Sequence, residues 1–216
     1  MQPLRLIQNH ILPFPVRRVY CVGRNYAEHR QEMGGSEREL PFFFMKPSDS
    51  VFQAPSISYP SNTAELSYEA ELVVLVGENE SIFGYSLGVD LTKRDLQKEA
   101  KKMSRPWESS KSFDFSALIG DIVPYNDVKS RVEDAKIELK LNGTVKQSAI
   151  VDQMIWSIPE LISQLKSQDF SVKQGDVIFT GTPAGVGPLK IGDKCEVSLT
   201  HEGKDVVPRL VFSVSS

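Results

Sequence analysis

The stretch from Tyr68 to Gly77, Tyr-Glu-Ala-Glu-Leu-Val-Val-Leu-Val-Gly, is the strongest constraint on the fold. Its apolar, β-branched second half is typical of a buried strand. Residues i and i+2 of a strand project from the same face, so Glu69 and Glu71 would lie side by side at the mouth of a buried sheet. These like charges repel, and a hard divalent cation such as Mg²⁺, Mn²⁺ or Ca²⁺ suits such an oxygen-only ligand set. The alternative is a polar strand end with both glutamates solvated.

Length and charge restrict the class of protein. The chain has 216 residues, 40% of them hydrophobic, which is enough for one substantial core. We expect a single domain, with residues 1–15 as an N-terminal extension. Lys and Arg number 25 against 28 Asp and Glu, without a basic stripe, so nucleic acid is not an expected partner.

Apolar runs, the N-terminal pattern and the cysteine count bear on the cellular compartment. No run approaches the roughly 20 apolar residues of a membrane span, and the N-terminus lacks a signal-peptide pattern. Cys21 and Cys195 are too few for a disulfide scaffold. We therefore expect a cytoplasmic location and no membrane partner.

Short extended segments outnumber helical patterns along the chain. We expect strands at 16–22, 57–59, 70–76, 178–180, 194–200 and 206–214, and a hairpin at 137–150 around Asn142-Gly143. Helical patterns lie at 26–33, 91–103 and 158–167, the last capped by Ser157. Segments 34–60 and 104–135 are expected to be long excursions rich in Pro, Ser and Phe. The pattern predicts an α+β domain that leans towards antiparallel pairing.

Polar residues gather at three further places. Asp90 could cap a helix starting at Leu91, with Arg94 and Gln97 on the same helix face, or it could be a third carboxylate on the same cation. Lys111 lies in a loop where a solvated surface position is the simpler interpretation. The glycine-rich turn at 181–187 could hold a carboxylate through its backbone N–H groups. It lacks the spacing of a nucleotide-binding loop, so no nucleotide cofactor is expected.

The order of these blocks resembles the fumarylacetoacetate hydrolase family, particularly its small single-domain branch of acylpyruvate hydrolases and oxaloacetate decarboxylases or tautomerases. The resemblance covers roughly residues 16 to 212. It rests on Cys21-Val22-Gly23-Arg24-Asn25-Tyr26, Lys46-Pro47, Tyr68-Glu69-Ala70-Glu71-Leu72, the blocks from Gly84 to Asp90 and from Arg94 to Gln97, Lys111-Ser112-Phe113-Asp114, and Gly181-Thr182-Pro183-Ala184-Gly185-Val186-Gly187.

The resemblance carries expectations for fold and site. It implies a β-rich roll of mixed sheets with few short helices, a homodimer, and a small 2-oxo acid substrate. Mg²⁺ or Mn²⁺ would be the cofactor, with no organic group. The implied metal ligands are Glu69, Glu71 and Asp90, and Lys111 would lie near the reacting carbonyl. The residues that would bind substrate are Arg24, Arg94, Gln97 and Thr182. Alternatively, Arg94 and Gln97 would orient the metal ligands.

His29 and Glu32 distinguish activities within the family. They are three residues apart in the expected helix 26–33, so both can share a face. Spacing alone favours a solvated surface helix. In the acylpyruvase branch, however, a His and a Glu at this spacing follow the Gly-Arg-Asn-Tyr block on a lid helix and activate water. The resemblance therefore implies a catalytic dyad, with Gly34-Gly35 as a hinge.

The expected activity is metal-dependent hydrolysis of the C–C bond of acylpyruvates (2,4-dioxo acids) to pyruvate and a carboxylic acid, through a metal-chelated enolate. One alternative is oxaloacetate decarboxylation or keto-enol tautomerisation. Another is an isomerase or decarboxylase of homoprotocatechuate-type catabolism. A non-catalytic metal-binding scaffold is the alternative of another class, and the retained Lys111, Thr182 and carboxylate triad argue against it.

Two departures from the family pattern and one apolar run affect the surroundings of the expected site. Ser67 and Tyr68 stand where relatives often carry an acidic residue and a histidine, and residues 115–120 replace the family's usual Cys-Pro-containing stretch. The apolar run at 41–45 could form core or line the acyl pocket, and we expect core.

Overall fold

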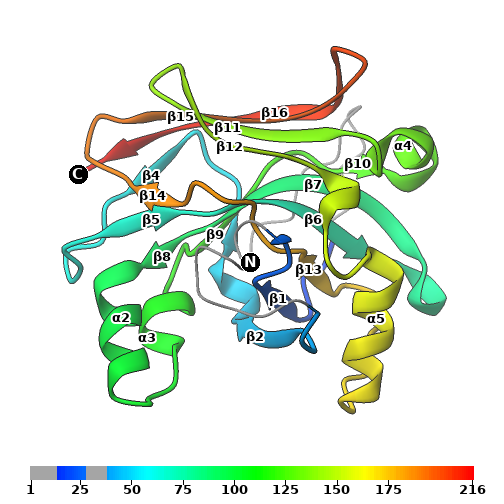
Figure 1. Ribbon diagram of the computed structural model, residues 1–216, viewed down its shortest axis with the longest axis horizontal. Helices are drawn as coiled ribbons and strands as arrows, with labels where there is room; N and C mark the ends of the chain where they lie inside the picture. Colours follow the sequence, from blue (N-terminus) through cyan, green and yellow to red (C-terminus); the bar gives the residue numbers. More distant parts are fainter. Residues whose placement is uncertain (1–13, 28–37) are drawn as a thin grey trace.

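The computed structural model describes residues 14–27 and 38–216. It contains three sheets and a few short helices (Figure 1). The strands are β1 (Val19–Gly23), β2 (Phe42–Lys46), β3 (Val51–Phe52), β4 (Ser56–Ser58), β5 (Leu66–Tyr68), β6 (Ala70–Val76), β7 (Ile82–Asp90), β8 (Thr92–Lys93), β9 (Ala117–Ile119), β10 (Val123–Pro124), β11 (Lys136–Leu141), β12 (Thr144–Ile150), β13 (Val177–Phe179), β14 (Gly187–Pro188), β15 (Lys194–His201) and β16 (Lys204–Ser215). The helices are α2 (Arg94–Lys102), α3 (Glu108–Lys111), α4 (Tyr125–Val132) and α5 (Ile158–Ser167), with 3₁₀ turns at Ser48–Ser50, Glu78–Glu80 and Val151–Gln153.

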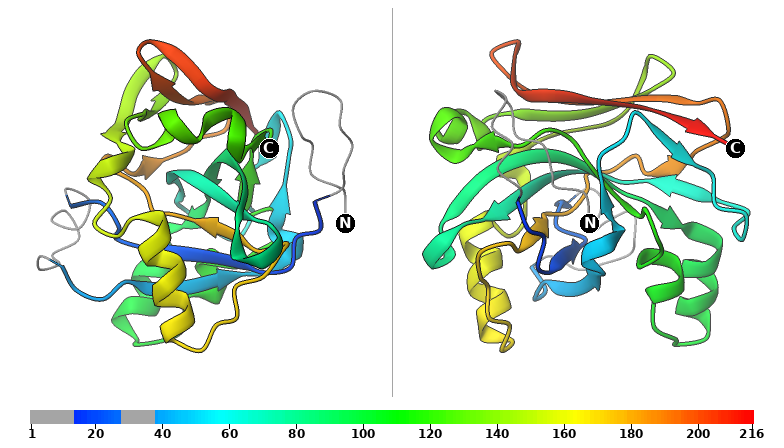
Figure 2. Two further views of the ribbon diagram at one scale, coloured as in Figure 1. Left: turned by 90° about the vertical axis from the view of Figure 1, so that its right-hand side faces the viewer. Right: turned by 180° about the vertical axis from the view of Figure 1, so that it is seen from behind.

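The sheets are mixed, as the sequence predicted. The largest has the strand order β2-β1-β13-β6-β7-β9-β3, with β10 paired to β7; the others are β12-β11-β15-β16-β4 and β14-β5-β8. Parallel pairs join β1 to β13, β3 to β9 and β16 to β4, and all other pairs are antiparallel. The five-stranded sheet lies over one side of the large sheet, while α5 and the α2–α3 pair flank the opposite side at its two ends (Figures 1 and 2). This confirms the expected β-rich α+β roll.

Strand β6 lies at the centre of the core, and all seven of its residues are buried. Leu72 and Val74 belong to the larger apolar cluster, which also contains Val197 of the five-stranded sheet. Val73 and Leu75 point to the other face, into a smaller cluster around β1 and β13. Because both faces of β6 are covered, its apolar run is continuous and does not alternate between apolar and polar residues.

Several elements occur as predicted. Strand β6 and helix α5 have the predicted bounds. The hairpin of β11 and β12 turns at Asn142 and Gly143, whose φ values of 51° and 79° are the positive angles that a tight turn requires. At the start of α5, the Glu160 carboxylate accepts a hydrogen bond from the backbone N–H of Ser157 at 2.9 Å.

Other expectations were wrong. Helix α2 begins at Arg94 rather than Leu91, because the chain stays extended through β8, which pairs with β5. Asp90 is therefore the last residue of β7 and not a helix cap. Apart from β4, which agrees with the strand expected at 57–59, the excursions at 34–60 and 104–135 contain β2, β3, α3, β9, β10 and α4 in the described part.

The helix expected at 26–33 lies outside the described residues from residue 28 onwards and stays a prediction. Within residues 14–27 and 38–216, no helix is both long and apolar enough to cross a membrane.

One buried side chain joins the five-stranded sheet to the start of β6. Gln147 of β12 accepts a hydrogen bond from Ala70 N at 3.0 Å through Oε1. Its Nε2 donates to Thr182 Oγ1 and to Pro183 O, both at 2.8 Å. The Thr182 hydroxyl in turn donates to Ala70 O at 2.9 Å. Both backbone groups of Ala70, the residue between the two glutamates, are thereby fixed in place.

Replacing Gln147 by Met should lower the free energy of unfolding by about 1–3 kcal/mol, because the variant keeps the side-chain length but leaves the buried Ala70 N–H without its acceptor. Urea unfolding measures the change. Val145→Thr, at an exposed position of the same strand, is the matched control and should stay within about 0.5 kcal/mol of wild type. Equal stability of Gln147→Met and the control would contradict the role of Gln147 in fixing Ala70.

Candidate active site

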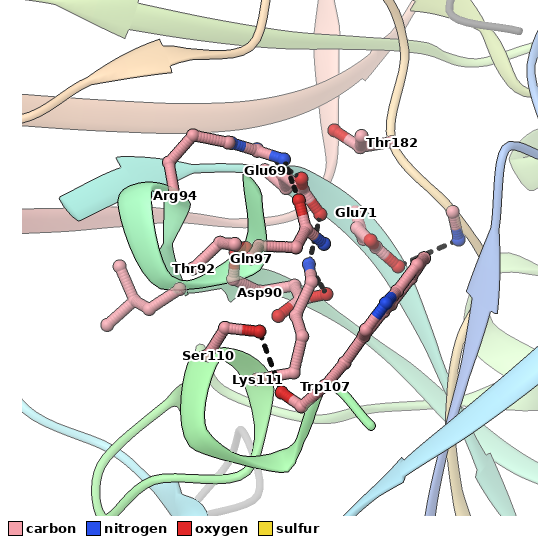
Figure 3. A network of polar contacts seen from close by, with 12 residues as sticks. Glu69, Glu71, Asp90, Thr92, Arg94, Gln97, Trp107, Ser110, Lys111 and Thr182 are labelled. Carbon is pink, nitrogen blue, oxygen red and sulfur yellow. Dashed lines mark hydrogen bonds and ion pairs between the residues drawn. The ribbon is translucent and has the colours of Figure 1, made fainter. Parts of the chain in front are cut away.

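Three carboxylates converge where β6 and β7 meet. Glu69 immediately precedes β6, Glu71 lies within it, and Asp90 ends β7. The pairing of Ala70 with Val89, together with a hydrogen bond from Asp90 N to Glu69 O at 2.8 Å, places these positions next to each other. One oxygen from each carboxylate lies within 4.8 Å of the others, and the three residues are only 7%, 2% and 0% exposed (Figure 3). The alternative, in which Glu69 and Glu71 are solvated at a strand end, is thus excluded.

Positive side chains surround two of these carboxylates. The Lys111 ammonium lies 2.6 Å from both Glu69 Oε2 and Asp90 Oδ2, between the two groups (Figure 3). Lys46 Nζ lies 2.9 Å from Asp90 Oδ1. Arg94 Nη2 donates to Glu69 Oε1 at 2.5 Å. Ion pairs at this depth are needed because an isolated buried charge is strongly unfavourable.

Glu71 is stabilised by a backbone group instead. Gly181 N donates to Glu71 Oε2 at 2.7 Å, so the glycine-rich turn does hold a carboxylate, that of the protein itself. Gly181 has φ +103°, and a Cβ there would lie 2.6 Å from Asn25 Cβ, so only glycine fits. Burial raises the pKa of Glu71 well above its usual range, and the charges of Asp90 and Glu69 raise it further.

The donor set suits a hard divalent cation. All three groups offer oxygen, they converge on one small buried volume, and Mg²⁺ and Mn²⁺ prefer such ligands. Asp90 Oδ1 is buried without a hydrogen bond, although Lys46 lies beside it as an ion pair. A cation shared by Glu69, Glu71 and Asp90 would supply the attraction that their mutual repulsion requires.

Lys111 and Lys46 are both buried, each 2% exposed. The simpler interpretation of Lys111 as a solvated surface residue is excluded, because the last residue of α3 turns its side chain inwards onto the carboxylates. Burial alone would lower the pKa of Lys111, but the opposite charges of Asp90 and Glu69 outweigh it and the pKa is raised. Lys46 also donates to the backbone O of Lys111. It therefore ties Asp90 to the end of α3.

Lys46 appeared in the sequence only as part of a motif. A lysine ending an apolar strand, after Phe42-Phe43-Phe44-Met45, was the signal that it would be buried and therefore paired. Gln147 was also missed, because a lone glutamine in an exposed hairpin carries no local signal of its buried contacts.

Arg94 and Gln97 belong to the support of Glu69. Arg94 Nη1 donates to Gln97 Oε1 at 2.7 Å while its other nitrogen holds Glu69. This is the ligand-orienting role expected as one alternative. The Thr182 hydroxyl lies beside the cluster, with its proton donated to Ala70. Substrate contact by Thr182 remains a prediction.

A cavity opens above the carboxylates. It is lined by Val22, Gly23, Arg24, Phe42, Phe44, Glu69, Glu71, Arg94, Gln97, Lys101, Trp107, Lys111 and Thr182. Phe42 and Phe44 therefore line the cavity, whereas Phe43 packs against the core, so the core expected at 41–45 is only partly correct. Neither Lys101 nor Trp107 belongs to one of the sequence motifs.

The remaining predicted features fall outside the described residues or outside the cavity wall. His29, Glu32 and the Gly34-Gly35 hinge fall outside the described residues. The described segment 115–120 stays out of the cavity wall: Phe115 is 63% exposed and 117–119 form β9. This departure from the family pattern therefore leaves the cavity lining intact.

Without divalent cations, thermal stability should contain a component that falls as pH rises. The folded pKa of Glu71 exceeds the ordinary value of 4.5, so the folded state binds more protons than the unfolded state above that pH. Thermal unfolding in EDTA from about pH 5 to 8 measures this component, which Glu71→Gln should lack. Added Mn²⁺ should raise the melting temperature most at the high-pH end. A wild-type minus Glu71→Gln difference that is independent of pH would contradict this account.

The comparisons with known proteins agree with this site. Residues 18–207 match the family model described as "Fumarylacetoacetate (FAA) hydrolase C-terminal". Oxaloacetate tautomerase YcgM of Escherichia coli is 36% identical, over 94% of this chain and 97% of its own length. A mitochondrial oxaloacetate tautomerase of Homo sapiens is 38% identical, over 85% of this chain and 87% of its own.

Solved structures show the same fold. The fumarylpyruvate hydrolase of Pseudomonas aeruginosa, crystallised with Mn²⁺ and pyruvate, is 40% identical, with a TM-score of 0.90 over 99% of this chain and 95% of that chain. Mn²⁺ in that relative agrees with the donor set found here. On the family match over most of its length and on these relatives, the chain belongs to the fumarylacetoacetate hydrolase family.

Proposed function

We propose that this protein hydrolyses the C–C bond of acylpyruvates in a metal-dependent reaction, releasing pyruvate and a carboxylic acid. The observation that carries the proposal is the buried carboxylate cluster at the floor of the cavity, with the Lys111 ammonium 2.6 Å from two of its members. The similarity to a fumarylpyruvate hydrolase supports the same activity.

The cofactor we propose is Mg²⁺ or Mn²⁺ held by Glu69, Glu71 and Asp90. When bound, it would supply a Lewis acid that stabilises negative charge on the 2-oxo oxygen of the substrate. The carboxylate and adjacent keto oxygen of a 2-oxo acid are hard donors that suit such a cation, whereas the acidic cluster alone would repel them. Arg94 and Gln97 hold Glu69 in position for this purpose.

The remaining chemistry falls to side chains of the protein. His29 accepts a proton from water as the water oxygen attacks the C4 carbonyl, and Glu32 orients the imidazole. Lys111 stabilises the oxyanion that forms at C4. The C3–C4 bond then breaks. C4 leaves as the carboxylic acid, and the electron pair stays on the pyruvate part, which takes at C3 the proton that His29 accepted from water.

Oxaloacetate tautomerisation or decarboxylation is the second candidate. Several curated relatives that match 85% or more of this chain are named oxaloacetate tautomerases. Neither reaction needs an attacking water, so the carboxylate floor and Lys111 would suffice without His29. The expected homodimer and cytoplasmic location stay predictions.

Replacing His29 by Ala should separate the two candidates. If His29 generates the nucleophile, hydrolysis of acetylpyruvate should fall by roughly 10²-fold or more, the scale of losing a general base. Oxaloacetate turnover should survive far better. Steady-state assays of both substrates with one enzyme preparation measure this difference.

Two further variants serve as references. His201→Ala, on β15 away from the cavity, should keep both activities, whereas Asp90→Asn should lose both because it removes an anionic ligand. Unchanged acetylpyruvate hydrolysis in His29→Ala would remove the dyad and make oxaloacetate chemistry the leading function. Full activity of Asp90→Asn with ordinary Mg²⁺ would remove Asp90 from the site.

A further inference from the structure

Two cations in the cavity wall have no anionic partner among the residues that the structure describes. Arg24 follows β1 with a left-handed φ of 59°, and Lys101 lies in the last turn of α2. Both are half-buried and line the same cavity as Glu69 and Glu71. The other cations of the site, Lys46, Arg94 and Lys111, are each paired with a carboxylate. Within the described ranges, neither Arg24 nor Lys101 makes an ion pair or a side-chain hydrogen bond.

The two charges act on each other. Lys101 Nζ lies over an aromatic face, 5.0 Å from the centre of the Trp107 ring. Desolvation lowers the pKa of Lys101, and the positive charges of Arg24 and Arg94 lower it further. Two like charges in a partly desolvated wall are unfavourable by themselves and become favourable when an anion binds between them. The wall therefore has the electrostatics of an anion site.

The subsite is separate from the metal floor. Glu71, Asp90 and Lys111 are almost completely buried, whereas Arg24 and Lys101 are half-exposed. Trp107 lines the cavity together with Phe42 and Phe44, with ring centres 5.5 Å and 6.2 Å away. A short carbon chain can pack against these rings with one end at the floor and the other near the two cations.

We propose that Arg24 and Lys101 form a second anion subsite that binds a carboxylate at the far end of the acyl group. This inference rests on the proposed function. It specifies the substrate class as a 2-oxo acid with a carboxylate at each end. An acyl group ending in methyl or phenyl would leave both cations unpaired, so the cavity would select against it.

Direct binding tests the subsite without catalysis. In the presence of Mn²⁺, isothermal titration would compare 2-oxoglutarate with 2-oxopentanoate, which has the same chain length but lacks the distal carboxylate. Wild type should prefer 2-oxoglutarate by roughly 10-fold or more, the scale of one charge-assisted hydrogen bond. In Lys101→Met, which keeps the aliphatic length, the affinity for 2-oxoglutarate should exceed that for 2-oxopentanoate by less than about 3-fold.

The same ratio should appear in turnover. The kcat/KM for fumarylpyruvate divided by that for acetylpyruvate should fall roughly 10-fold or more in Lys101→Met, mainly through KM for fumarylpyruvate. Lys98→Met is the matched control on the same helix, because Lys98 is exposed and pairs with Glu65 outside the cavity, and it should retain the wild-type ratio.

The binding and turnover measurements separate the subsite from the proposed hydrolysis. No wild-type preference for 2-oxoglutarate, an unchanged ratio in Lys101→Met, or an equal loss for both ligands would overturn the subsite. A preference that depends on Lys101, in an enzyme that hydrolyses neither acylpyruvate, would support the subsite while refuting the proposed hydrolysis.

Discussion

The repulsion among three buried carboxylates is the constraint on which the rest of the site depends. Glu69, Glu71 and Asp90 lie within 4.8 Å of one another in a region from which water is largely excluded. Such a cluster persists only if positive charge is supplied, and Lys111 contacts two of its members at once. A divalent cation would complete this compensation and give the cluster a chemical purpose.

The surrounding fold holds the carboxylates in place before any ligand arrives. Strand β6 is covered on both faces, and its pairing with β7 fixes Asp90 opposite the glutamates. Gln147 and Thr182 bind the two backbone groups of Ala70, which restricts the directions in which Glu69 and Glu71 leave the strand. Rigid elements and side chains locked by neighbours are what a precise metal site requires.

Features with a local cause could be predicted from the sequence. The apolar run of β6, the Asn142-Gly143 turn and the start of α5 depend on neighbouring residues, and the structure has them as expected. The position of Lys111 depends on contacts with residues 21 and 42 positions away, and the Gln147 to Ala70 contact spans 77. No local pattern reveals such contacts. The family resemblance did place Lys111 near the chemistry, where its surroundings alone suggested a surface loop.

The central claim is that Glu69, Glu71 and Asp90 share one divalent cation. Anomalous scattering from a crystal of the wild-type protein grown with Mn²⁺ tests it most directly, because the method locates the metal independently of activity. The account predicts one strong peak about 2 Å from an oxygen of each carboxylate, with Lys111 Nζ displaced from its position between Glu69 and Asp90. A peak elsewhere, or no peak while Lys111 still bridges the two carboxylates, would contradict it.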